Sequence, residues 1–149
     1  MATIRLLPDF KEFLKLLNAR RVEYLLIGGY AVGYHGYPRA TADMDIWVAM
    51  QPRNAEKMVA VLKEFGFDPP GLSAALFLKE NQIARMGVPP VRLEICTSIS
   101  GVEFDECYRE RVVATIDGVQ VSLIGLKHLK INKKASGRHK DLNDLENLP

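Results

Sequence analysis

The sequence predicts a single α/β domain (in the wide sense that includes α+β folds), with a mixed β-sheet and helices packed mainly on one face. Apolar residues recur at helical spacing in some segments, and short apolar runs bounded by glycine or proline lie between them. The chain has 149 residues and is 48% hydrophobic, which is enough for one core. No internal repeat, linker or low-complexity tract divides it, so residues 1–149 are expected to form one domain.

Two amphipathic helices are expected in the first half of the chain. One begins at Pro8, because proline fits the first turn of a helix. Its apolar stripe consists of Phe10, Phe13, Leu14 and Leu17. The other begins at Pro52 and ends at Gly66. Its apolar face consists of Met58, Val59, Leu62 and Phe65.

Strands are predicted where apolar runs of strand length are bounded by turn residues. The expected strands are residues 22–27, 43–48, 82–86, 91–95, 112–116 and 119–123. Asp117-Gly118 joins the last two strands and is a strong signal for a two-residue hairpin turn. Short helices are expected over 30–36 and 74–78, and a longer helical segment over 125–148.

Composition and charge exclude several classes of protein. The net charge of +2 is too small for a general binder of nucleic acid or membranes. The longest apolar run, 24–34, is too short to span a bilayer, and the first residues lack the apolar core of a signal peptide. Cys96 and Cys107 form no disulfide framework or zinc motif and fit a reducing compartment. The three histidines lack metal-ligand spacing, so surface or capping roles are expected. We therefore expect a cytoplasmic protein with no membrane partner.

The most informative motif is the acidic pair Asp43 and Asp45 in a predicted strand. Residues i and i+2 of a strand point to the same face, so both carboxylates project together. Two adjacent carboxylates repel each other unless a cation lies between them. Mg²⁺ accepts such oxygen ligands and keeps positions open for phosphate oxygens. The alternative is an exposed polar strand end. Trp47, in the same strand, is expected to point away from the pair into the core.

Two further features are candidates for the same site. Gly28 and Gly29 follow an apolar strand, where they let a ligand approach the backbone and direct N–H groups toward it. A tight turn is the alternative interpretation of this glycine pair. Glu94 interrupts an apolar strand with a charge that must be solvated, paired or bound to metal. Its alternative is an edge-strand glutamate that faces water.

Together these features resemble the DNA polymerase β-type nucleotidyltransferase superfamily. The shared pattern is a strand that ends in Gly-Gly, an Asp-x-Asp strand after a gap of thirteen residues, and a later strand with one acid. More closely, the chain is similar to the small bacterial nucleotidyltransferases, which include minimal nucleotidyltransferases and abortive-infection toxin enzymes. Residues 26–32, 36–45 and 132–145 carry that similarity. The resemblance implies a nucleotidyltransferase fold.

The resemblance also implies roles for the acidic residues and the glycines. Asp43 and Asp45 would hold one or two Mg²⁺ ions, with a two-ion site expected. Glu94 would complete the acceptor-side metal site and take the proton of the acceptor hydroxyl, and it stands where that group usually has Asp. Gly28 and Gly29 would cradle the triphosphate of an NTP donor. Transfer of the NMP to the acceptor would release pyrophosphate.

The C-terminal tail supplies positive charge. Residues 127–140 contain six lysine or arginine residues and no aspartate or glutamate. If one helix covers this stretch, the 3.6-residue period places on one face Leu126, Leu129, Lys133, Gly137, Lys140 and Asp144. Asp141 and Asp144 are expected to orient the basic groups through ion pairs rather than to bind metal. The alternative is a solvated basic helix face.

Five more residues become candidates for nucleotide binding beside this resemblance. Lys133 is the first choice for a contact with the triphosphate, and Arg138 and Lys140 come second. Arg39 and Thr41 lie just before the acidic strand, where they are placed to contact phosphate or to brace the acidic pair. An ordinary solvated loop is the alternative for these two.

The resemblance leaves the acceptor open. A tRNA end, a protein hydroxyl and a small molecule are all compatible with it, and the donor is open among ATP, CTP, GTP and UTP. The first alternative function is a toxin–antitoxin component that acts on or with a partner protein or tRNA. The second is a catalytically decayed nucleotide-binding module. A homodimer that builds part of the cleft is a further expectation.

Overall fold

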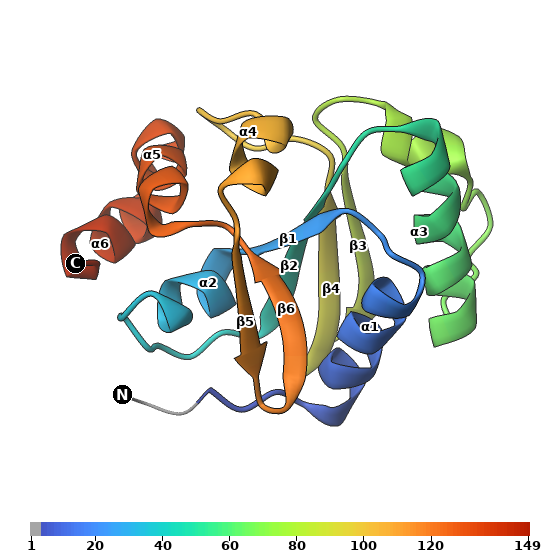
Figure 1. Cartoon of the computed structure of the whole chain (residues 1–149), viewed down its shortest axis with the longest axis horizontal. Coiled ribbons are helices and arrows are strands. Elements are labelled where there is room, and N and C mark those ends of the chain that lie inside the picture. The colour runs from blue at the N-terminus through green and yellow to red at the C-terminus, as the bar shows by residue number, and fades with distance from the viewer. Residues whose placement is uncertain (1–3) are drawn as a thin grey trace.

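The computed structural model describes residues 4–149, which contain a six-stranded sheet in the order β3-β4-β2-β1-β6-β5 (Figure 1). The strands are β1 (Tyr24–Ile27), β2 (Asp43–Val48), β3 (Ile83–Val88), β4 (Val91–Cys96), β5 (Val112–Ile116) and β6 (Val119–Leu123). β1 runs antiparallel to β2 and parallel to β6, and β2 runs parallel to β4, so the sheet is mixed. Every predicted strand is present, with its ends within two residues of the prediction. The predicted fold class is confirmed.

Within residues 4–149, six α-helices and one short 3₁₀ helix surround the sheet. They are α1 (Pro8–Ala19), α2 (Gly28–Tyr34), α3 (Pro52–Phe65), η1 (Ala74–Leu78), α4 (Phe104–Arg109), α5 (Leu126–Ser136) and α6 (His139–Asn147). Prolines open α1 and α3 as predicted, and Gly66 ends α3 with a φ of +104°. The sequence did not predict α4, because six residues with one buried side chain, Cys107, show no helical period. None of these helices is both long and apolar enough to cross a bilayer.

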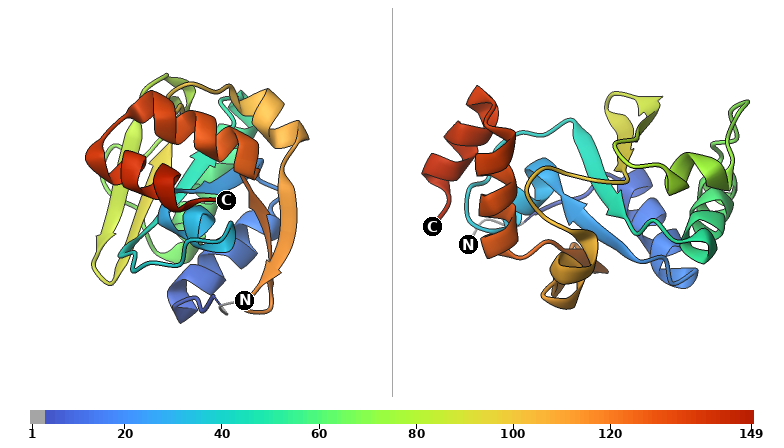
Figure 2. Two further views of the ribbon diagram at one scale, coloured as in Figure 1. Left: turned by 90° about the vertical axis from the view of Figure 1, so that its left-hand side faces the viewer. Right: turned by 90° about the horizontal axis from the view of Figure 1, so that it is seen from above.

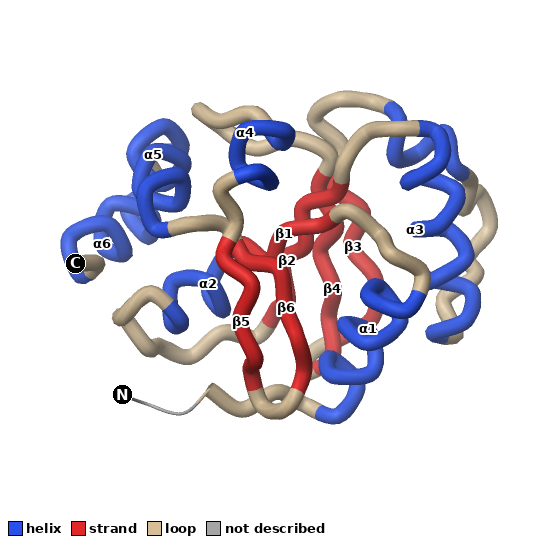
Figure 3. Tube along the Cα trace, in the orientation of Figure 1, coloured by secondary structure: helices blue, strands red, loops and turns tan. Residues whose placement is uncertain are grey.

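The core lies between the sheet and the two longest helices, α1 and α3, which pack against each other. Phe13 of α1 and Met58 of α3 are fully buried and belong to the same apolar cluster as Met44 of β2. In Figure 3, α1 and α3 lie to the right of the strands, and α5 and α6 lie to the left. Asp43 and Asp45 alternate with Met44 and therefore stand on the other face of the sheet, where they are half-buried.

Trp47 is buried as predicted, but it lies on the same face of β2 as the acidic pair. The expectation that it points away from the carboxylates is wrong, because residues 43, 45 and 47 alternate together along the strand. Helix α4 covers the indole: the Phe104 ring meets it edge-on at 5.1 Å, and its Nε1–H donates to the Thr97 carbonyl at 3.2 Å. This face is thus closed beside Trp47 and more open beside the carboxylates.

The basic tail forms two helices, so the interpretation of residues 127–140 as one helix is wrong. Gly137 ends α5 in a left-handed conformation with a φ of +64°. The chain then turns, and α6 packs beside α5 at one end of the molecule (Figure 2). The carboxylate of Asp141 accepts a hydrogen bond from the backbone N–H of Arg138, the residue that caps α6, at 3.3 Å. The face predicted by the 3.6-residue period therefore stops at Gly137.

Candidate active site

Strand pairing brings the predicted acidic residues to neighbouring positions on the open face of the sheet. Asp45 of β2 lies opposite Ile27 of β1 on one side and opposite Glu94 of β4 on the other. Because directly paired residues share a face, Asp45 and Glu94 stand side by side. Gly28 follows Ile27 directly, so the glycine pair, Asp45 and Glu94 meet at the centre of the sheet.

Two arginines, which the sequence interpretation did not include, pair with the outer carboxylates. Arg92 donates to both oxygens of Asp43, at 2.9 Å and 2.7 Å. Arg85 donates to Oε1 of Glu94 at 2.7 Å. Each arginine lies directly opposite its partner in the register of the sheet. The strand ends predicted from sequence would have placed Arg85 opposite Arg92, so the pairing with Glu94 depends on a tighter turn between β3 and β4.

Asp45 differs from the outer acids because one of its oxygens is buried without a partner. Its Oδ1 is shielded from solvent and makes no hydrogen bond. Burial raises the pKa of Asp45 to about 7, with hydrogen bonding to Glu94 and the negative charges of Glu94 and Asp43 acting in the same direction. An orphaned carboxylate oxygen beside a second acid matches the oxygen ligands that Mg²⁺ prefers. Asp45 and Glu94 therefore offer oxygen ligands of the kind that the expected cation takes, whereas Arg92 holds both oxygens of Asp43.

The two glycines allow the backbone to approach these side chains closely. Gly28 has a φ of +67°, and a Cβ at this position would overlap Oδ2 of Asp45. A Cβ at Gly29 would lie 2.6 Å from Oγ1 of Thr41. Any larger residue at either position would displace the side chain packed against it. Packing against Asp45 and Thr41 thus requires glycine at both positions, independently of the predicted role toward phosphate.

Substitution of Gly28 by alanine is expected to destabilise the protein by about 1–3 kcal/mol from backbone strain, plus the cost of moving Asp45. Gly118→Ala is the matched control, because Gly118 has a φ of +82° and nothing lies within 4 Å of its added Cβ. Urea unfolding of both variants would isolate the steric contribution. A smaller loss for Gly28→Ala than for Gly118→Ala would contradict the close approach to Asp45.

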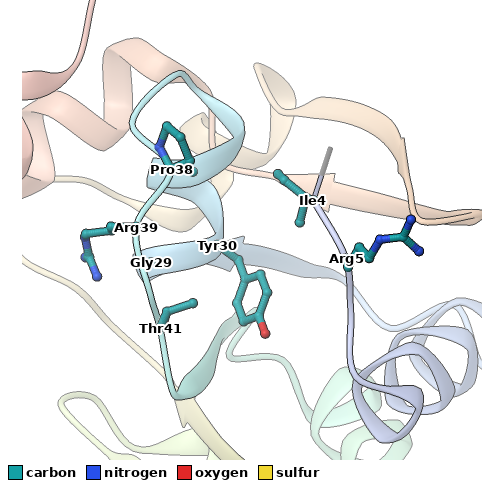
Figure 4. Close-up of a pocket in the computed structure, with 8 residues that line it drawn as sticks. Ile4, Arg5, Gly29, Tyr30, Pro38, Arg39 and Thr41 are labelled. Atoms are coloured by element: carbon teal, nitrogen blue, oxygen red, sulfur yellow. The ribbon is translucent and has the colours of Figure 1, made fainter. Parts of the chain in front are cut away.

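Arg39 and Thr41 brace the loop before β2. Thr41 Oγ1 donates to the carbonyl of Asp43 at 3.1 Å, and Arg39 binds both carboxylate oxygens of Asp144, at 2.7 Å and 2.8 Å. Figure 4 shows Arg39, Thr41 and Gly29 around a cavity of about 260 Å³ whose lining residues include no carboxylate. Thr41 thus contacts the strand that carries the acidic pair, and Arg39 ties the loop to α6.

A separate cleft of about 380 Å³ joins the acidic face to the C-terminal helices. One side is formed by residues of the sheet and the glycine pair, namely Gly28, Gly29, Asp45 and Glu94. The other side carries the predicted basic residues Lys133, Arg138 and Lys140. The structure therefore brings seven of the ten predicted site residues to one cleft. Asp43, Arg39 and Thr41 lie outside its lining.

Lys133 is buried between two carboxylates rather than free in the cleft. Its side chain Nζ lies 3.2 Å from Asp141 and 3.1 Å from Asp144, and the residue is 4% exposed. Burial alone would raise the pKa of Asp141 and Asp144. Hydrogen bonds outweigh burial and lower both values, from Arg138 and Lys133 to Asp141 and from Arg39 and Lys133 to Asp144. The aspartates thus form the ion pairs expected of them.

Lys140 is the most available cation of the cleft. It is exposed, lines the cleft, and takes part in none of the salt bridges found in residues 4–149. Arg138 also lines the cleft, but its guanidinium binds Asp141 at 2.7 Å. Of the three basic residues, Lys140 is therefore the first candidate for a phosphate contact, ahead of the ion-paired Lys133 and Arg138.

Two solved structures share the fold of this chain over most of its length. A candidate nucleotidyltransferase of Thermotoga maritima has a TM-score of 0.63 and 14% identity, with 92% of this chain and 88% of that chain covered. An antigenic nucleotidyltransferase-like protein of Paracoccidioides brasiliensis has a TM-score of 0.57 and 19% identity, with 92% and 72% covered. The sequence itself has no significant match to a protein-family model or to a curated protein. The chain therefore has the nucleotidyltransferase fold, as the sequence predicted.

Proposed function

We propose that the protein is a Mg²⁺-dependent nucleotidyltransferase that moves an NMP from an NTP to an acceptor hydroxyl. The new bond joins the acceptor oxygen to the α-phosphorus, and pyrophosphate leaves as the bond to the β-phosphate breaks. The observation that carries this proposal is the orphaned Oδ1 of Asp45, which lies beside Glu94 in a cleft with a basic opposite wall. Negative groups that need a cation and positive groups that face them suit a metal–triphosphate complex.

The residues of the chain have separable roles in this reaction. Asp43, Asp45 and Glu94 would hold Mg²⁺, which when bound neutralises developing charge on the attacking and leaving oxygens. Glu94 would accept the proton of the acceptor hydroxyl through a carboxylate oxygen. Gly28 and Gly29 would present backbone N–H groups to the triphosphate.

Arg85 and Arg92 would have to release their partners when the metal–nucleotide complex binds. Both arginines lie at the surface, Arg85 fully and Arg92 in part. Their exchange of a carboxylate for a phosphate oxygen would keep a charge-assisted contact for each guanidinium. The ion pairs of the free protein are thus compatible with a cation site that forms together with nucleotide binding.

Replacement of Lys140 by alanine is expected to raise the KM for the NTP by about 10-fold or more, because a charge-assisted hydrogen bond contributes about 1.5–3 kcal/mol. The free energy of unfolding should not change, since Lys140 makes no salt bridge among residues 4–149. Lys134→Ala is the matched control, because it removes the same charge from an exposed position outside the cleft. Steady-state kinetics would test the difference, and equal changes in KM would remove Lys140 from the site.

The activity can be tested by incubating the protein with each NTP, labelled at the α-phosphate, and Mg²⁺ in a cell extract. Label is expected on an acceptor from the α-position and not from the γ-position, because pyrophosphate leaves. The Asp43→Ala/Asp45→Ala double variant should transfer none. Labelling of RNA, a protein band or a small molecule would assign the acceptor class, including the proposed tRNA or protein partner of a toxin–antitoxin pair. Absence of transfer with all four NTPs would contradict the proposal.

A nucleotide-binding module without turnover is the second candidate function. It is favoured by the bidentate contact of Arg92 with Asp43, which occupies both oxygens of a proposed metal ligand. This module would bind an NTP in the presence of Mg²⁺ and transfer nothing in the same assay. Equilibrium binding measured beside transfer therefore separates the two candidates.

A further inference from the structure

A second cluster of potential metal ligands lies away from the acidic face of the cleft. Glu106 in α4, Glu110 at the C-terminal cap of α4, and His128 in α5 place one ligand atom each within 4.8 Å of one another. His128 Nε2 lies 3.7 Å from Oε1 of Glu106 and 3.6 Å from Oε2 of Glu110. Among residues 4–149, no other three His, Cys, Asp or Glu residues bring their ligand atoms within 4.8 Å of one another. The expectation that the histidines have surface or capping roles is wrong for His128, which is buried.

The imidazole of His128 points into this cluster without a hydrogen-bond partner. The residue is 2% exposed, and its Nε2 is buried and makes no hydrogen bond. Separations of 3.6 Å and 3.7 Å to the carboxylates exceed hydrogen-bond length. A buried polar atom without a partner is unfavourable and rare in folded proteins. This nitrogen therefore lacks a ligand at the point where two carboxylates converge on it.

Among residues 4–149, neither glutamate forms a salt bridge with a lysine or an arginine. They stand four residues apart on one helical turn, an arrangement in which like charges repel. Lys127 lines the adjoining cavity of about 270 Å³ but forms no salt bridge with either glutamate. Both carboxylate side chains are half exposed, at 55% and 53%, so an ion from solvent can reach them.

We propose that Glu106, Glu110 and His128 form a binding site for Zn²⁺ that links α4 to α5. Ligands about 2.0–2.1 Å from a tetrahedral zinc ion lie about 3.3 Å from one another. The observed separations of 3.6 Å and 3.7 Å from Nε2 to the carboxylates are close to that value, so a small side-chain movement completes the site. Two carboxylates and a neutral imidazole balance the charge of the ion, and water supplies the fourth ligand from the exposed side.

The ligand chemistry separates this site from the proposed magnesium site. Imidazole nitrogen favours zinc and related transition metals, whereas Mg²⁺ prefers oxygen ligands alone. The three carboxylates at the sheet offer only oxygen. The two sites should therefore differ in metal preference, and zinc binding here does not depend on the proposed transfer activity.

The zinc site would fix the position of α5. Helices α4 and α5 stand beside each other at the upper side of Figure 1, and the β5–β6 hairpin connects them along the chain. Lys133 and Asn132, which line the cleft, belong to the same helix as His128. A metal link at the start of α5 thus holds the helix that supplies one wall of the cleft.

Zinc binding can be measured by calorimetry on protein freed of metal, in excess Mg²⁺ to occupy oxygen-only sites. One Zn²⁺ per chain is expected, with a rise of several degrees in Tm. Glu106→Gln and Glu110→Gln should each weaken zinc binding at least about 10-fold, and the double variant should abolish it. Glu106 and Glu110 are exposed, so these substitutions leave the core intact. His128→Gln, at a buried position, is a third variant.

Glu103→Gln is the matched control, because Glu103 lines the same cavity but is not one of the three ligands. It should bind zinc as tightly as the wild-type protein. Failure of the wild-type protein to bind zinc at a saturable site would overturn the proposal. Unchanged zinc affinity of the Glu106→Gln/Glu110→Gln double variant would also overturn it, because the ion would then lie elsewhere.

Discussion

Substitution of Asp45 by asparagine is expected to lower kcat of the proposed nucleotidyl transfer by about 10³-fold or more, because loss of one charge from the proposed magnesium site would remove several kcal/mol of transition-state stabilisation. Asp45 is the central acid of the row, with Glu94 beside it and Asp43 two residues before it. Asparagine keeps the shape of the side chain and one oxygen but removes the negative charge. The loss should therefore appear in catalysis rather than in folding.

Stability measurements provide the internal check on this variant. The carboxylate of Asp45 has an orphaned oxygen and a raised pKa of about 7, mainly because of burial, so its charge does not stabilise the free protein. The free energy of unfolding of Asp45→Asn should equal or exceed that of the wild-type protein. Asp68→Asn, at an exposed position, is the control and should leave both quantities unchanged. Equal activity of the two variants would exclude Asp45 from catalysis.

Replacement of Lys133 by methionine is expected to lower the free energy of unfolding by about 3–5 kcal/mol, since removal of one partner leaves buried charges uncompensated. Asp141 and Asp144 are each 1% exposed, and both lie within salt-bridge distance of Lys133. Methionine keeps the length and the apolar stem of lysine. Urea unfolding would measure the effect, with Lys134→Met as the control at an exposed neighbouring position.

The difference between the wild-type protein and Lys133→Met should depend on pH. The pKa values of Asp141 and Asp144 are lowered in the folded state, so their stabilisation is complete above about pH 4 and decreases as pH falls through the folded values. The two proteins should therefore converge in stability in acid. Unchanged stability together with a raised KM for NTP would instead identify Lys133 as a triphosphate ligand, as the sequence first suggested.

The sequence was sufficient to predict the elements that depend on local pattern. Residues 43–48 and the hairpin over 112–123 have the predicted boundaries, because alternation and an Asp-Gly turn are local signals. The meeting of Gly28, Asp45 and Glu94 was also predictable, since each lies at or next to a recognisable strand. The resemblance to nucleotidyltransferases assigned these residues to one site, and the order of their strands in the sheet was known only from the structure.

Features that depend on tertiary geometry could not be predicted in the same way. A single left-handed residue, Gly137, divides the basic tail and turns Lys133 toward two aspartates of the following helix. A two-residue difference in register decides that Arg85 faces Glu94. The cluster around His128 joins helices with a hairpin between them, so no spacing in the sequence reveals it.

The contact of Arg39 with Asp144 has a consequence for the order of folding. It joins residues 105 positions apart, and the cleft brings the glycine pair at 28 and 29 together with residues 132–141. Closing such long loops is entropically costly, whereas the β3–β4 and β5–β6 hairpins close short ones. The hairpins are therefore expected to form early and the cleft in the last step. Partly folded forms of the chain would then contain the hairpins but not the cleft.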